Sequence, residues 1–84
     1  MTEELNLDSM TISKLWKLHN DAKDHPRLIA KKYGLTVSDM RLYKNYAANK
    51  ATAMSCRLDG RIQSALTYED ICNSLYDAMK IKQW

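Results

Sequence analysis

The sequence has few of the residues that build tight turns and strained loops. Its 84 residues include two glycines, one proline and no phenylalanine. Glycine and proline shape most tight turns, and glycine allows the unusual backbone geometry of many catalytic loops. Leucine, alanine, lysine and methionine are common instead, and these residues favour helices. The composition therefore predicts an all-α protein, and we expect no enzymatic activity.

Long apolar runs are also absent, and cysteines are few. No apolar run approaches the roughly 18 residues of a membrane-spanning helix. The first ten residues (MTEELNLDSM) are acidic and polar, unlike a secretory signal. We therefore expect neither a membrane-spanning helix nor a secretory signal. The expected location is the cytoplasm, which is the host cytosol if the protein is viral. Cys56 and Cys72 lie in segments expected to be helical, and we expect both to be reduced.

Residues of the types that bind metals or cofactors do not occur at the spacing of a known binding motif. His19 and Asp21 are two residues apart, so they do not share a helical face, and His25 is expected in a turn. No cysteine or third histidine completes a closed zinc set. Glu69 and Asp70 suit the positive end of a helix dipole better than acid–base catalysis. We expect neither a metal nor a cofactor.

Basic residues are concentrated in the middle of the chain. The net charge is +3, but residues 11–57 contain ten Lys and Arg against three Asp, whereas 1–10 and 58–84 are both net acidic. A basic segment of this kind is typical of a surface that faces phosphates. An ordinary solvated helix surface is the alternative, because helices are commonly rich in lysine.

Hydrophobic periodicity predicts a compact bundle of four helices, or five if a short additional one forms. An acidic flexible tail is expected at 1–8, followed by a single helical domain at 9–84. Ser9 or Thr11 can cap the first helix, in which Trp16 is expected to be a core anchor. The inward face of this helix is expected to hold Ile12, Leu15, Trp16 and His19.

The remaining helices are placed by turn and cap residues. The second covers about 26–33, with its inward side chains expected to be Leu28, Ile29 and Tyr33. The third begins after Thr36 and continues for about six turns. Gly60 marks the next turn, after which 61–66 can form a short helix. Thr67 is expected to cap the last helix, whose predicted inward face is Tyr68, Ile71, Cys72, Leu75 and Met79.

Residues 26–45 (PRLIAKKYGLTVSDMRLYKN) form a distinctive segment. Gly34 suits the left-handed position that ends a helix, because glycine enters positive φ without a Cβ penalty. Thr36 is a good N-cap for the helix that follows, and the small Ala30 lets the two helices approach closely. In this order and spacing the segment resembles a helix-turn-helix of the DNA-binding type.

The resemblance implies that the start of the third helix enters the major groove of DNA. Arg41 can donate two hydrogen bonds to guanine and Asn45 can pair with adenine. Asp39 argues against this hypothesis, since it would repel a phosphate unless it accepts from a cytosine amino group. The residues expected at bases or phosphates are Thr36, Val37, Ser38, Arg41, Lys44 and Asn45. Those expected over the DNA backbone, on the preceding helix, are Arg27, Lys31 and Lys32.

The leading hypothesis is a small helix-turn-helix DNA-binding protein that regulates transcription or genome maintenance, of the kind found in phages and mobile elements. Double-stranded DNA is the expected partner. A homodimer is a candidate assembly, because one unit buries little DNA surface. A minor alternative is single-strand binding, with bases stacked on Tyr46 and Tyr76 as exposed platforms.

A second hypothesis comes from a different class of function. The chain can be a small helical adaptor or inhibitor that docks on a larger enzyme or polymerase complex. Trp84 and Ile81 are then the expected anchors, because tryptophan is enriched in binding hot spots. No membrane contact is expected under either hypothesis.

Overall fold

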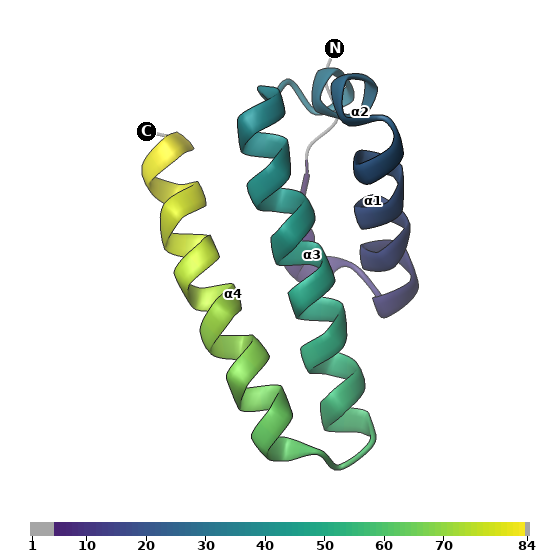
Figure 1. Ribbon diagram of the computed structural model, residues 1–84, viewed down its shortest axis with the longest axis vertical. Helices are drawn as coiled ribbons and strands as arrows, with labels where there is room; N and C mark the ends of the chain where they lie inside the picture. Colours follow the sequence, from purple (N-terminus) through teal and green to yellow (C-terminus); the bar gives the residue numbers. More distant parts are fainter. Residues whose placement is uncertain (1–4, 84) are drawn as a thin grey trace.

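The computed structural model of the chain describes residues 5–83, with side chains as far as residue 79 (Figure 1). A short 3₁₀ turn, η1 (Leu7–Ser9), precedes four α-helices: α1 (Ile12–Asp24), α2 (Pro26–Lys32), α3 (Val37–Leu58) and α4 (Ile62–Gln83). No strand occurs between residues 5 and 83. The predicted all-α bundle of four helices is confirmed. Within the described range no helix is both long and apolar enough to cross a bilayer.

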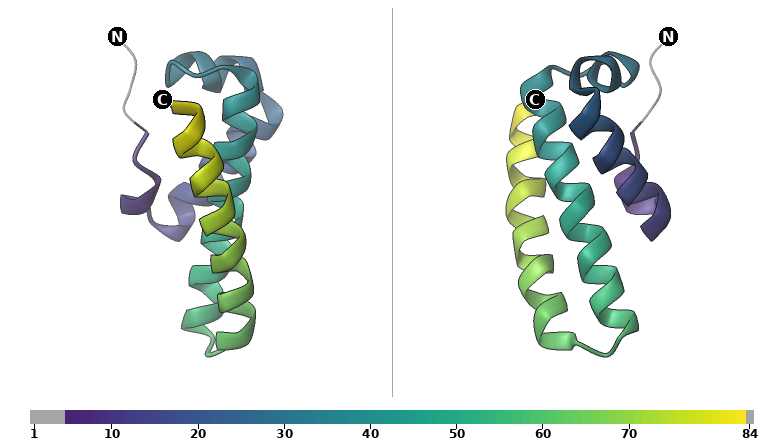
Figure 2. Two further views of the ribbon diagram at one scale, coloured as in Figure 1. Left: turned by 90° about the vertical axis from the view of Figure 1, so that its left-hand side faces the viewer. Right: turned by 45° about the vertical axis from the view of Figure 1, so that its right-hand side comes forward.

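Helix α3 is the central element of the bundle. In Figure 1, α4 runs antiparallel beside one flank of α3, α1 lies along the other, and α2 crosses the end at which α3 begins. η1 lies on one side of the α3–α4 pair, and the turn between these two helices projects beyond α1 (Figures 1 and 2). The two ends of α3 therefore have different surroundings.

The core lies where α1, η1 and α4 meet α3. Leu15 and Met40 are its largest fully buried side chains. Small residues on α3, including Ala47 and Ala51, are also completely buried and let neighbouring helices approach its backbone closely. The other members of the buried cluster are Leu7, Leu18, Ala22, Ala30, Tyr43, Tyr46, Cys72 and Met79.

Two glycines end helices in the left-handed conformation. Gly34 has φ 69° and Gly60 has φ 79°, which costs a residue with a Cβ about 1 kcal/mol or more. At each turn the glycine N–H and the next N–H donate to the last carbonyls of the preceding helix, as in a Schellman motif. The predicted helix-ending role of Gly34 is confirmed.

Threonines cap α1 and α3. Thr11 Oγ1 accepts from the Lys14 N–H at 3.3 Å, and Thr36 Oγ1 accepts from the Asp39 N–H at 3.1 Å. Each satisfies a backbone donor that has no partner within its own helix. The predicted start of α3 after Thr36 is confirmed, and of the two caps considered for α1 it is Thr11 that acts.

The start of α4 differs from the prediction. The helix begins at Ile62, so residues 61–66 form neither a separate helix nor a loop, and Thr67 is not a cap. The Thr67 hydroxyl lies within the helix and donates to the Gln63 carbonyl at 3.2 Å. The turn at Gly60 reverses the chain at once, and no glycine or proline follows it to delay the helix. Glu69, expected near a helix start, forms a bidentate pair with Arg57 of α3 instead.

Several predicted core residues are more exposed than expected. Trp16 is 39% exposed and Leu28 is 65% exposed. Helix α1 buries the narrower stripe of Leu15, Leu18 and Ala22 against α3, which leaves Trp16 at the edge. The seven residues of α2 cover only one end of α3, and among the described residues little covers Leu28. On α4, Cys72 and Met79 are buried, Tyr68 and Leu75 are half-buried, and Ile71 is 40% exposed.

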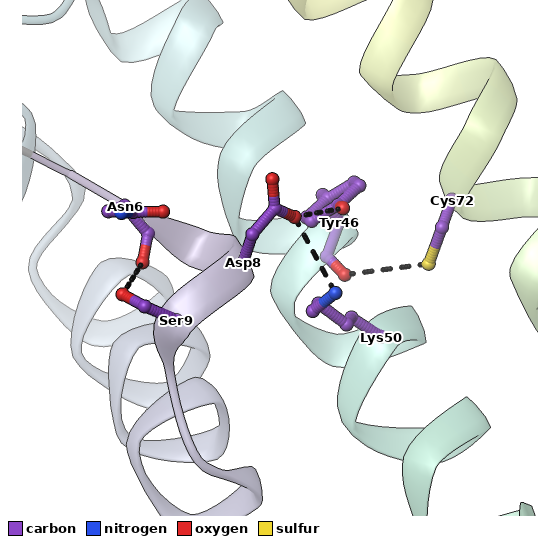
Figure 3. A network of polar contacts seen from close by, with 6 residues as sticks. All are labelled: Asn6, Asp8, Ser9, Tyr46, Lys50 and Cys72. Atoms are coloured by element: carbon purple, nitrogen blue, oxygen red, sulfur yellow. Dashed lines mark hydrogen bonds and ion pairs between the residues drawn. The ribbon is translucent and has the colours of Figure 1, made fainter.

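The described part of the expected tail packs against the core and contacts α3. Leu7 is buried in the core, and the Asp8 carboxylate accepts from the Tyr46 hydroxyl at 3.0 Å (Figure 3). Lys50 Nζ lies 3.5 Å from the same carboxylate. Leu5, Leu7 and Asp8 thus make packing or polar contacts, whereas 1–4 lie outside the described residues, and the flexible tail expected at 1–8 stays a prediction.

Tyr46 is also not an exposed platform, because only 6% of it is exposed. Its backbone carbonyl accepts a weak hydrogen bond from Cys72 Sγ at 3.9 Å. Cys72 and Cys56 are both buried and free. Burial raises the pKa of the Cys72 thiol, so this cysteine keeps its proton more firmly than an exposed one.

Candidate nucleic-acid interface

The turn between α2 and α3 sets the position of the first half of α3. Ala30 is buried where the two helices meet, and Met40 and Tyr43 are buried on the inner side of α3. The burial of Ala30 agrees with the close approach of the two helices that its small side chain was expected to allow. The opposite side of α3 must then face solvent over its first turns, because a helix presents its two sides alternately every half turn.

That opposite side carries three exposed polar residues, Ser38, Arg41 and Asn45. At 3.6 residues per turn they fall within about 60° of one another around the helix axis. We call these three residues the polar stripe. All three were predicted at the DNA surface, and the structure brings them together on one side of α3. Asn49 and Thr52 continue the stripe along the next turns and are half-buried. Asn49 and Thr52 were not predicted at this surface, although their spacing of four and seven residues from Asn45 places them on the same side of a helix.

The other predicted residues of α3 lie off the stripe. Val37 is half-buried and packs against the core cluster. Thr36 is exposed, but its oxygen already accepts the capping hydrogen bond from Asp39. Asp39 itself is displaced from every member of the polar stripe by about 100° or more around the helix. The acid that argued against a DNA surface therefore does not face the same way as the stripe.

Lys44 lies at one edge of the stripe. Its Nζ donates to Asn45 Oδ1 at 3.3 Å, and its backbone carbonyl lies 3.2 Å from His19 Nδ1 of α1. Asn49 Nδ2 donates to the Asn45 carbonyl at 2.8 Å. His19 thus ties α1 to α3 beside the stripe, and the Trp16 ring meets the His19 ring edge-on at 5.8 Å between centroids.

The predicted cations of α2 are all exposed. Arg27 and Lys31 are four residues apart and so share one side of this helix. Lys32 points in another direction, with its Nζ 5.5 Å from the centre of the Tyr33 ring. Since α2 crosses the start of α3 (Figure 1), the cations of α2 lie at the same end of the molecule as the polar stripe.

A pocket opens at the junction of α1, α2 and α3. Its volume is about 200 Å³. Its cationic residues Arg41 and Lys44 were predicted at the DNA surface, whereas Lys23, from the last turn of α1, was not. Only the packing of α1 against α3 brings Lys23 to this place, so no local sequence pattern indicates it. The residues that line the pocket are Ala22, Lys23, Pro26, Met40, Arg41 and Lys44.

The arrangement at this end is thus a polar stripe on one helix, exposed cations on a second and a cationic pocket beside both. No protein-family model, curated protein or solved structure matches this chain. Among the residues that the structure describes, no group of three His, Cys, Asp or Glu side chains is placed to hold a metal ion.

The two predicted anchors of the adaptor hypothesis cannot be placed. Trp84 lies outside the described residues, and so does the side chain of Ile81. Exposed apolar side chains occur elsewhere, at the turn between α3 and α4. Leu58 is 79% exposed, and Ile62 and Leu66 are 46% and 45% exposed. We call these three residues the apolar tip.

Proposed function

We propose that this protein binds double-stranded DNA, with the first half of α3 in the major groove and α2 across the backbone. The observation that carries the proposal is the exposed polar stripe of Ser38, Arg41 and Asn45, directly opposite the buried Met40 and Tyr43. A groove-reading helix needs this division, because one side must be fixed to the protein while the other meets base edges.

Charge supports the same proposal. Arg27 and Lys31 extend into solvent from α2, and neither forms part of the core. Cations at this position can contact phosphates and set the register of α3 without reading sequence. The side-chain amide of Asn45 can read adenine, and the Ser38 hydroxyl can bond to either a base or a phosphate. Regulation of transcription or of genome maintenance is the role that we propose for such binding.

The proposal is tested by fluorescence anisotropy with random-sequence duplex DNA at several salt concentrations. If about four phosphates are neutralised, affinity should fall about 100-fold between 50 and 200 mM salt, because bound cations release counter-ions. Lys31→Ala should reduce the salt slope by about one. Lys14→Ala, an exposed substitution near the opposite end of α1, serves as the matched control. Absence of binding at 50 mM salt would contradict the proposal.

Protein docking is a second candidate function, favoured by the apolar tip. Three large apolar side chains exposed together at one turn suit a protein contact better than a DNA contact. We propose a second copy of this chain as the partner, since two copies would double the DNA surface covered on a symmetric site. Docking on a larger complex stays the alternative. Binding to such a partner should depend only weakly on salt, unlike binding to DNA.

A further inference from the structure

The pocket between α1, α2 and α3 combines an apolar floor with a cationic rim. Ala22 and Met40 are buried and Pro26 is half-buried, so their side chains form its apolar part. Lys23 and Arg41 are exposed, and both line the same space. Lys44 is half-buried and is the third cation. The six lining residues include no carboxylate, so nothing in the lining neutralises these three positive charges.

The size and chemistry of the pocket select the class of ligand. Its volume of about 200 Å³ is several times the roughly 30 Å³ that one water occupies in the liquid. An anion held by three cations gains charge-assisted hydrogen bonds, and a guanidinium matches the geometry of phosphate oxygens. The apolar floor suits carbon atoms attached to that anion. A phosphate ester with a sugar has both parts.

We infer that this pocket holds one phosphate of the DNA backbone, with the attached deoxyribose against the apolar floor. The inference rests on the proposed function and deepens it, because it names a contact made by α1, which lies outside the helix-turn-helix segment. It also changes the role of Arg41. This side chain belongs to the polar stripe and also lines the pocket, and the inference assigns it to the phosphate and not to guanine. Base reading then falls to Ser38 and Asn45.

The experiment measures duplex affinity and salt slope for single variants, on random DNA and on a site selected with the wild-type protein. Lys23→Ala and Arg41→Ala should each weaken binding to both kinds of DNA by about fivefold near physiological salt, and lower the slope by about 0.9. Asn45→Ala should weaken binding mainly to the selected site. Lys17→Ala, on α1 and exposed, is the matched control and should change neither quantity.

The outcomes separate the pocket from the proposed function. If wild-type protein binds no DNA at low salt, the proposed function fails and the inference fails with it. If it binds but Lys23→Ala matches Lys17→Ala, the pocket holds no DNA phosphate although the function stands. A loss confined to the selected site for Arg41→Ala would return this residue to base reading and overturn its assignment.

A second arm of the experiment distinguishes a DNA phosphate from a free phosphate compound. Inorganic phosphate is titrated into the protein while amide NMR signals are followed. Shifts at residues 22–26 and 40–44 that the duplex reproduces at far lower concentration support the inference. Shifts with inorganic phosphate that the duplex does not reproduce would assign the pocket to a free phosphate compound and overturn it. Equal melting temperatures of the variants verify that each is folded.

Discussion

Tyr46 shows why burial of a single residue is hard to predict from sequence. A tyrosine on a basic helix can be an exposed platform or a core residue, because its ring is apolar and its tip is polar. Here the ring is buried and the hydroxyl donates to Asp8, a residue 38 positions away. The Tyr46 ring also meets the ring of Tyr76 on α4 in a tilted arrangement, with 6.1 Å between the ring centroids. The burial of Tyr46 thus depends on tertiary contacts with both the N-terminal segment and α4.

The buried Tyr46 and its hydrogen bond to Asp8 predict how the stability of the protein changes at alkaline pH. Burial, with the hydrogen bond to Asp8 as the next cause, raises the pKa of Tyr46 above its ordinary value of 10.0. Its protonated form is therefore favoured in the folded state. The corresponding stability is fully present below pH 10 and is lost as the pH rises further, because the unfolded chain releases the proton first. Tyr46→Phe should reduce this alkaline loss, measured as urea unfolding free energy against pH.

At neutral pH the variant should lose about 0.5–1.5 kcal/mol for the missing hydrogen bond. Asp8→Ala provides the control, because it removes the acceptor and leaves the phenol in place. If the pair interacts as described, the double variant should lose less than the sum of the single losses. Strictly additive losses would contradict a direct bond between Tyr46 and Asp8. Some alkaline dependence should persist, since burial also raises the pKa of Tyr43.

Other residues were predicted correctly where adjacent residues determine their role, and wrongly where tertiary packing does. Gly34 and Thr36 were predicted correctly because a helix end is determined by a few adjacent residues. Trp16 and Leu28 were predicted wrongly because periodicity indicates which side of a helix is apolar but not how much of that side a neighbour covers. In the candidate interface, the polar stripe follows from helical spacing, whereas Lys23 enters only through tertiary packing.

At the scale of the helix, the two long elements differ in how they begin. Helix α3 starts after an extended residue whose side chain caps it, with Thr36 at φ −75° and ψ 162°. Helix α4 starts directly after the Gly60 turn and continues through Thr67. A threonine followed by acidic residues resembles a cap in both places. Whether it acts as one depends on the backbone before it, which must leave the helical conformation.

This difference predicts opposite effects for the same substitution. Thr36→Ala should lower the free energy of unfolding by about 1 kcal/mol, because the Asp39 N–H loses its acceptor. Thr67→Ala should be neutral or should stabilise by a few tenths of a kcal/mol, since alanine is the better residue inside an exposed helix. Urea unfolding of the two variants measures both. A loss of about 1 kcal/mol in Thr67→Ala, as large as at a true cap, would mean that α4 begins near Thr67 after all.

At the scale of the whole molecule, the cations of α2 and the apolar tip lie at opposite ends. The described fold measures 40 × 25 × 20 Å. The cations of α2 lie at the end where α3 begins, and the apolar tip lies at the α3–α4 turn (Figures 1 and 2). A contact at the tip would therefore leave the polar stripe free. The sequence shows that its middle is basic, but the separation of the α2 cations from the apolar tip depends on the length of α3.

The separation of the two ends predicts that self-association and DNA contact can be altered independently. Leu58 is 79% exposed, so Leu58→Glu should change the free energy of unfolding by less than about 0.5 kcal/mol. If two copies meet at the apolar tip, the same variant should be monomeric in sedimentation velocity at concentrations where the wild type is dimeric, because the dimer would bury the new carboxylate. Its affinity for a single half-site should be unchanged.

Leu28→Glu makes the same chemical change at another exposed leucine and should leave self-association intact, because Leu28 lies on α2 at the opposite end. A wild-type protein that stays monomeric at about 100 μM would contradict a dimer of useful strength, since this concentration corresponds to only about 5.5 kcal/mol of association free energy. DNA binding would then have to come from one unit, and the length of the protected site would be about half that expected for a pair.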